Sequence, residues 1–219
     1  MNDGLSAAEP RTPVVQRRFA VQIGWTLVVR LLMTANSVIA GIIVARWLGA
    51  EGLGQLGVIN VSVAMIVQLG SAGLPSANTY FIAKDQSRLL PAALNSLLFA
   101  LLVGSALALA LTLTARLRPD WFGFISPELI KIAAISIPFQ LITLIGLNIF
   151  LAVGDVRRFN LLDLSGQSFV LINALVALIV LNKELVTLVT LNTAASVLVG
   201  LVIVALVAMH GVRIKNGFL

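Results

Sequence analysis

Six long apolar runs dominate this 219-residue sequence and place the strongest limit on its fold. A membrane-spanning α-helix needs about 20 mostly apolar residues, and each run reaches that length. We place the spans at Phe19–Trp47, Leu53–Phe81, Leu89–Leu113, Leu129–Val153, Phe159–Leu181 and Leu185–Met209. The sequence therefore predicts an all-α polytopic membrane protein, a bundle of six transmembrane helices joined by short connections.

Composition supports the same fold class. Charged residues make up 11% of the chain, whereas a soluble domain has about 25%, so the apolar surface needs lipid as its solvent. The net charge of +6 is spread over short loops, and aromatic residues are 6%, which is not typical of a nucleic-acid surface. The absence of cysteine excludes disulfides and thiolate chemistry.

The hexapeptide GLGQLG, Gly52 to Gly57, matches the G-x-G-x-x-G pattern of dinucleotide sites. That pattern binds a nucleotide only after a strand, with an acidic residue about 20 positions further on. Here a long apolar run precedes it, and the next acidic residue is Asp85. We interpret the glycines as a turn at the membrane surface that begins the second span.

Lysine and arginine are distributed unequally between the two sides of the predicted bundle. The side of the N-terminus carries nine: Arg11, Arg17, Arg18, Lys84, Arg88, Arg157, Arg158, Arg213 and Lys215. The other side carries five: Arg46, Arg116, Arg118, Lys131 and Lys183. The positive-inside rule then predicts that both termini are cytoplasmic. Residues 1–18 are expected to be a flexible cytoplasmic tail, 19–209 the six-helix unit, and 210–219 a cytoplasmic tail or the start of a linker to a second lobe.

Two charged residues fall inside predicted spans, where a charge costs about 2.5 to 3.5 kcal/mol near the bilayer centre. Arg30 shares a helix face with Thr34 and Ser37, while Asp163 shares one with Gln167. Such groups are candidates for ligand binding or gating. The structural alternative for Arg30 is a pair with Asp163, and Asp163 is also a candidate proton or cation site.

Neutral polar residues in other spans serve either to pack helices together or to line a cavity. The second span carries Asn60 and Gln68, and the fourth and sixth carry Gln140 and Asn192. The predicted substrate-binding set is Arg30, Thr34, Ser37, Asn60, Gln68, Asp163 and Gln167.

No pattern of catalytic residues is present. The sequence lacks H-E-x-x-H, G-x-S-x-G, a P-loop and paired acidic motifs. Its one histidine, His210, follows the last span and is expected at the membrane interface. The sequence therefore predicts neither an enzyme nor a cofactor or metal site.

The segment Val44 to Asp85 reads VARWLGAEGLGQLGVINVSVAMIVQLGSAGLPSANTYFIAKD. Its GLP-x-A block contains Pro75, which removes a helical hydrogen bond and predicts a kink late in the second span. The piece beyond Pro75 is expected at the cytoplasmic headgroups, with Tyr80 in the aromatic belt. The alternative is a hinge for alternating access.

This segment resembles the polysaccharide transporter family, the flippases of O-antigen and other polyprenyl-linked oligosaccharides. The first block, AR-x-LG-x-x-x-[FL]-G, matches at Ala45, Arg46, Leu48, Gly49, Leu53 and Gly54. The second matches at Gly73, Leu74, Pro75, Ala77 and Tyr80. The other four spans resemble the family only in number and length. Family members have two six-helix lobes, so the resemblance covers an amino-terminal lobe.

The resemblance implies transport of a polyprenyl-diphosphate-linked glycan across the bacterial cytoplasmic membrane. In this hypothesis Arg30 attracts the diphosphate or acidic sugars, and the neutral polar residues contact sugar hydroxyls. The expected partners are the lipid-linked oligosaccharide, membrane lipids, and a second lobe, a second copy of the chain or glycan-assembly enzymes. Alternatives are a drug or cation antiporter of the same superfamily, a membrane scaffold that does not transport, and an enzyme that acts on polyprenyl phosphates.

Overall fold

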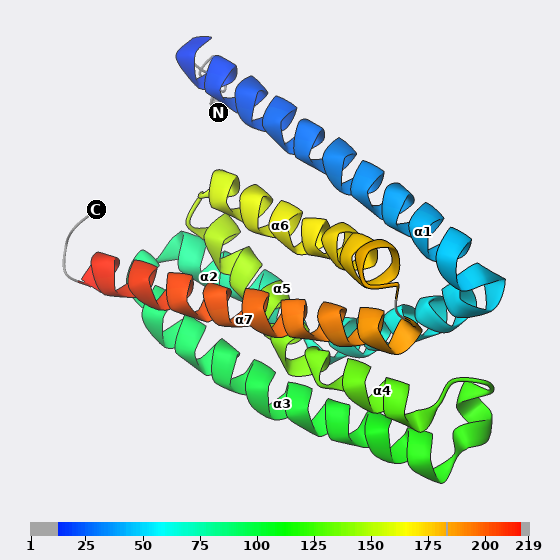
Figure 1. Cartoon of the computed structure of the whole chain (residues 1–219). Coiled ribbons are helices and arrows are strands. Elements are labelled where there is room, and N and C mark those ends of the chain that lie inside the picture. The colour runs from blue at the N-terminus through cyan, green and yellow to red at the C-terminus, as the bar shows by residue number, and fades with distance from the viewer. Residues whose placement is uncertain (1–12, 183, 216–219) are drawn as a thin grey trace, which may run out of the picture.

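The computed structural model describes residues 13–182 and 184–215, and nearly all of them are helical. The helices are α1 (Pro13–Gly70), α2 (Leu74–Lys84), α3 (Leu89–Leu117), α4 (Pro127–Ala134), α5 (Ser136–Ala152), α6 (Val156–Ala174) and α7 (Leu185–Lys215), with short helical turns η1 (Gln86–Arg88), η2 (Pro119–Phe122) and η3 (Leu175–Val180). The described part of the chain contains no strand (Figure 1). Five helical segments are long and apolar enough to cross a membrane. The chain is an all-α multi-pass membrane protein, as predicted.

Helix α1 contains the first predicted span and most of the second. Its apolar part, Ile23–Gly70, has 48 residues, or about 72 Å of helix, more than twice the hydrocarbon thickness of about 30 Å. At Gly49 the backbone leaves the helical region, with φ 69° and ψ −173°, a conformation essentially restricted to glycine. The helix bends there into a first arm, residues 13–48, and a second arm, residues 50–70 (Figure 1).

This bend changes the interpretation of GLGQLG. The chain turns at Gly49, and all six residues of the hexapeptide are helical. The predicted glycine-rich turn at Gly52–Gly57 is therefore wrong in position, because the single residue with positive φ before them is enough to reverse the chain. The helical backbone also agrees with the rejection of a nucleotide-binding loop, which requires a preceding strand.

The second predicted span is interrupted before Pro75. Residues 71–73 form a turn in which Ala72 and Gly73 have positive φ, 48° and 75°, and Pro75 then occupies the first turn of α2. Proline is tolerated there because the first helical N–H groups have no partner within the helix. Helix α2 packs against α3 and α5, and Asn78 within it is buried and donates to Ser96 Oγ at 2.8 Å. The break is thus a turn between two packed helices.

Two other predicted spans are not regular α-helices along their whole length. The fourth consists of α4 and α5, separated at Ile135, close to Pro138, which cannot donate a backbone hydrogen bond. The fifth consists of α6 followed by η3, a six-residue π-helix. π-Helical segments are rare and occur frequently at functional sites.

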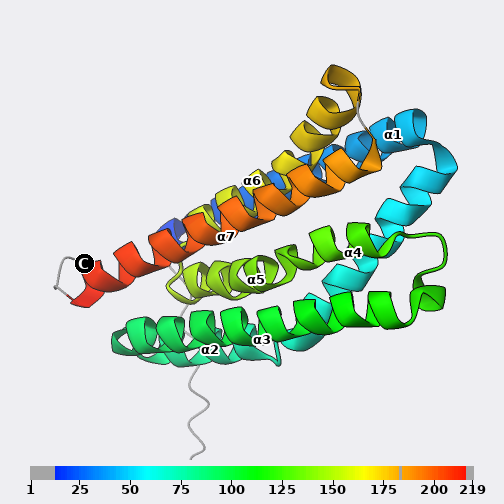
Figure 2. The same cartoon turned by 60° about the horizontal axis from the view of Figure 1, so that its bottom comes forward.

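Helix α5 lies at the centre of the bundle between α3 and α7 (Figure 2). Small residues allow these close contacts. A Cβ atom on Gly104 of α3 would lie 2.5 Å from Pro138 Cα, and one on Gly200 of α7 would lie 3.0 Å from Phe139 Cβ. One on Gly146 of α5 would meet Ile203. Helices that pack in a membrane commonly approach through such small residues.

The connections alternate between the two ends of the bundle. The α2–α3 and α5–α6 connections and the end of α7 lie at one end, while the Gly49 bend and the α3–α4 and η3–α7 connections lie at the other (Figure 1). At the first end Asp85 accepts from Ser87 Oγ at 2.6 Å, Ser87 N at 3.1 Å and Arg88 Nε at 3.0 Å. These bonds hold the pKa of Asp85 below its usual value, and the two bonds from Ser87 have the largest effect. Asp155 caps α6 in a similar way, through Arg158.

The helix boundaries alter the expected tails. Helix α1 begins at Pro13, so the last six residues of the tail predicted at 1–18 are helical, and α7 extends to Lys215 through most of the segment predicted at 210–219. Residues 1–12 and 216–219 lie outside the described residues, as does the side chain of His210.

The contact between α3 and α5 gives a stability prediction. In Gly104→Ala the new Cβ meets the backbone of Pro138, which cannot move aside as a side-chain tip can. We expect a loss of about 1–3 kcal/mol in unfolding free energy, measured by thermal unfolding in detergent. The control is Gly24→Ala, where the added Cβ has no neighbour within 4 Å. Equal stability of the two variants would contradict the close packing of α3 and α5.

Candidate functional site

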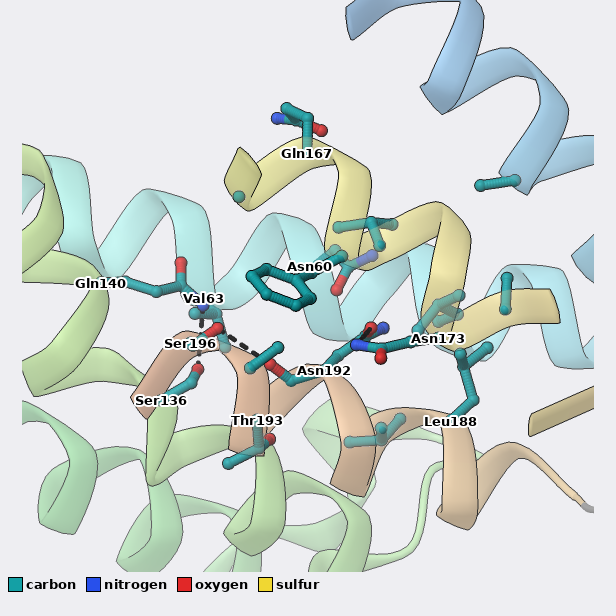
Figure 3. A pocket seen from close by; sticks show the side chains of 18 of the residues that line it. Asn60, Val63, Ser136, Gln140, Gln167, Asn173, Leu188, Asn192, Thr193 and Ser196 are labelled. Atoms are coloured by element: carbon teal, nitrogen blue, oxygen red, sulfur yellow. Dashed lines mark hydrogen bonds between the residues drawn. The ribbon is translucent and has the colours of Figure 1, made fainter. Parts of the chain in front are cut away.

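A cavity of about 580 Å³ lies between both arms of α1 and helices α4, α5, α6 and α7 (Figure 3). Its volume is in the range of small-molecule sites. Its walls combine apolar residues with amide and hydroxyl side chains. The polar lining residues are Ser37, Asn60, Ser136, Gln140, Thr143, Asp163, Gln167, Asn173, Asn192, Thr193 and Ser196. A cavity with this many polar side chains is unusual within helices that are otherwise apolar enough to span a membrane.

Three asparagines from three different elements line this cavity. Asn60 comes from the second arm of α1, Asn173 from α6 and Asn192 from α7 (Figure 3). The Nδ2 atom of Asn173 donates to Oδ1 of Asn192 at 2.9 Å. Asn173 lies two residues before the π-helical segment η3. We call Asn60, Asn173 and Asn192 the amide cluster.

Hydroxyl groups line the neighbouring wall, and the α4–α5 break positions one of them. Ser136 begins α5, donates to the carbonyl oxygen of Ala133 at 2.7 Å and accepts from Gln140 Nε2 at 2.9 Å. On α7, Ser196 donates to the backbone oxygen of Asn192 at 2.9 Å. These bonds satisfy the hydroxyl protons locally and leave oxygen lone pairs to accept from a ligand.

The first arm of α1 is joined to α6 by three polar contacts at successive positions. Asn160 Nδ2 donates to Thr26 Oγ1 at 2.9 Å, and Asn36 Nδ2 donates to Ser168 Oγ at 3.1 Å. Between them Arg30 NH1 lies 3.1 Å from Asp163 Oδ2. Asn160 is buried, and its Oδ1 atom has no hydrogen-bond partner among the described residues.

The sequence offers two expectations for Arg30, binding of a ligand and an ion pair with Asp163. In the structure Arg30 pairs with Asp163. Arg30 is not among the residues that line the cavity. Its side chain stays 52% exposed, whereas that of Asp163 is 23% exposed. Asp163 lies where the cavity and the contact with α1 meet, so its carboxylate is neutralised from the side of α1.

The structure brings together four of the seven predicted binding residues. Ser37, Asn60, Asp163 and Gln167 line the cavity, although Gln167 stands apart from the amide cluster (Figure 3). The other three are Arg30, Thr34 and Gln68. The Thr34 hydroxyl donates to the backbone oxygen of Arg30 at 2.9 Å, and Gln68 is exposed on the second arm of α1. Of the polar residues that share one face of the first arm, Arg30 contacts α6 and Ser37 lines the cavity.

Several lining residues were not among the predicted binding set. Gln140 and Asn192 were recognised as polar groups within spans, but Asn173, Ser136, Thr143, Thr193 and Ser196 were not singled out. One signal for Asn173 was available, because it is a polar residue within the fifth predicted span. The α4–α5 break beside Ser136 and the π-helix that follows Asn173 have no comparable signature in the sequence.

Comparison of the chain with models of known families, with curated proteins and with solved structures finds no match. The resemblance at Val44 to Asp85 therefore remains a prediction. In the described ranges, no group of three or more His, Cys, Asp or Glu side chains is placed to hold a metal ion. The chemistry of the cavity depends on amides, hydroxyls and one paired carboxylate.

The Arg30–Asp163 pair gives the second prediction. Arg30→Met leaves a carboxylate unpaired and Asp163→Asn leaves a guanidinium unpaired, so each change should destabilise the contact between α1 and α6. The double variant removes both charges and should recover stability, with a coupling energy of about 0.5–3 kcal/mol in a double-mutant cycle. Thr34→Val is the matched control, because Thr34 bonds only to its own helix. Purely additive losses would contradict the pair.

Proposed function

We propose that the chain is one lobe of a membrane transporter that moves a polyprenyl-diphosphate-linked oligosaccharide across the bacterial cytoplasmic membrane. The observation that carries the proposal is the polar cavity within a bundle of membrane-spanning helices. Polar groups in the hydrocarbon region are costly unless they face protein or water, and those of this cavity converge on one space. The resemblance of Val44 to Asp85 to glycan flippases supports the choice of substrate.

The chemistry of the lining favours a glycan over a cationic drug. Amide and hydroxyl groups dominate the polar wall, and they both donate to and accept from sugar hydroxyls. Asp163 is the one ionisable lining residue among those described, and Arg30 already neutralises it. An antiporter for cations would need an acidic group that the substrate can reach without displacing an arginine.

The diphosphate is assigned to a different position from the sugar. Arg30 remains about half exposed while it pairs with Asp163, so its other N–H groups are accessible to an anion. In this proposal the glycan enters the cavity and the diphosphate lies near Arg30, at the edge of the first arm of α1. The polyprenyl chain stays in the lipid.

The proposed transporter needs a second unit. A second lobe or a second copy of the chain completes the translocation path, since helices that insert in the same orientation suit a two-fold arrangement. Both termini are placed in the cytoplasm by the excess of lysine and arginine at that end, nine against five on the other.

A pair of neighbouring substitutions on α7 tests transport. Ala195 lines the cavity, whereas Ala194 is exposed and lies outside the lining. Ala195→Trp, introduced into the chromosomal gene, should fill the cavity and reduce surface glycan at least tenfold, while lipid-linked intermediates accumulate. Ala194→Trp should leave surface glycan unchanged. Lectin labelling of intact cells measures both.

Three results would contradict the proposal. Surface glycan at the normal level in Ala195→Trp, with the protein present in the membrane, would exclude transport through this cavity. Normal amounts of glycan with altered polymer length would favour the scaffold alternative. Unchanged glycan with increased sensitivity to cationic dyes would favour a drug or cation antiporter.

A further inference from the structure

The amide cluster has hydrogen-bonding capacity beyond what the protein uses. Each asparagine side chain offers two N–H donors and one acceptor oxygen. The bond from Asn173 to Asn192 uses one donor and one acceptor, which leaves the Asn192 amide group and the Asn173 oxygen available. Asn60 makes no side-chain hydrogen bond to another described residue, although it lines the same cavity.

The depth of the cluster makes this unused capacity significant. Asn60 lies about 16 Å along the second arm from Gly49, and Asn192 about 10 Å from the start of α7. Because the hydrocarbon core is about 30 Å thick, these distances place both side chains well away from the membrane surfaces. Donors and acceptors at that depth are costly unless a ligand or water occupies the space.

The residues around the amide cluster favour an uncharged ligand. The amides are uncharged, and the carboxylate of Asp163 is paired with Arg30 at 3.1 Å. A cation or an anion would thus lose its hydration without meeting an opposite free charge. The ring of Phe169 also lines the cavity, and its flat apolar surface suits the apolar face of a sugar ring.

We propose that Asn60, Asn173 and Asn192 form a binding site for one uncharged sugar ring, with Phe169 against its apolar face. The site rests on the proposed function and specifies it, because it assigns the selectivity for an uncharged sugar unit to the amide cluster. Paired donors and acceptors match neighbouring hydroxyls, whereas a carboxylate or ammonium group on the sugar is rejected. A site built to pair with hydroxyls discriminates strongly against ligands that leave its polar groups unpaired.

The test compares three sugars of similar shape and different charge on the purified chain in lipid nanodiscs. Glucose is neutral, protonated glucosamine is a cation and glucuronate is an anion, and saturation-transfer NMR measures the binding of each. We expect glucose to bind and the two charged sugars to bind at least tenfold more weakly. Asn60→Leu should weaken glucose binding about tenfold, because a sugar hydroxyl loses its partner.

Gln68→Leu is the matched control, since it makes the same amide-to-apolar change on the same arm of α1, outside the cavity lining. It should leave glucose binding unchanged. Asn60→Asp adds a carboxylate and should move the preference from glucose to glucosamine. Equal binding of the three sugars, or equal effects of Asn60→Leu and Gln68→Leu, would overturn the inference.

The two proposals fail in distinguishable ways. Loss of surface glycan in Ala195→Trp without selective glucose binding would contradict the amide site and leave the transport proposal standing. Selective glucose binding that depends on Asn60, with normal surface glycan in Ala195→Trp, would contradict transport and leave a sugar-binding site of another purpose.

Discussion

Hydrocarbon offers no hydrogen-bond partners, so every polar group within the membrane must find one inside the protein or face a water-accessible space. The arrangement of this chain follows from that constraint. The hydroxyls of Ser196 and Thr34 donate hydrogen bonds to backbone carbonyl oxygens of their own helices. Asn78 and Ser96 pair with each other where α2 meets α3. Eleven polar residues from both arms of α1, α5, α6 and α7 line the cavity, which is thus the least expected feature of the bundle.

The cavity exists because the bundle packs unevenly. Around α5 the backbones approach through Gly104, Gly146 and Gly200, which leaves no room for a Cβ atom. On the other side, the Gly49 bend separates the two arms of α1, and α6 loses its regular repeat at η3. Tight packing on one side and interrupted helices on the other leave a space lined by the residues that the interruptions position.

Much of the fold could be predicted because apolar length alone identifies helices that span a membrane. The predicted starts at Leu89 and Leu185 coincide with those of α3 and α7. The breaks and bends within the helices were harder to predict, because hydropathy does not report backbone conformation. Pro75 signalled a break, but the turn falls at residues 71–73, and the bend at Gly49 was displaced to the glycines that follow it.

The candidate site was predicted in part. Charge inside an apolar run singled out Arg30 and Asp163, and the structure pairs them. Asn60 and Gln68 looked equivalent in the sequence, yet only Asn60 lines the cavity, because helix rotation within the bundle separates residues that share one helix. Asn173 was missed, since its exposure to the cavity depends on how α6 meets α7 and the second arm of α1.

The proposed transport depends on access of water, within the membrane, to the cavity between α1, α6 and α7. The chain contains no cysteine, so single cysteines can be introduced without background and treated with a charged, water-soluble thiol reagent in intact membranes. Ser196→Cys, in the cavity, should be labelled rapidly, whereas Leu198→Cys, exposed on α7 outside the lining, should resist because it faces lipid. Protection of Ser196→Cys, or equal labelling of the two positions, would contradict the cavity on which this account depends.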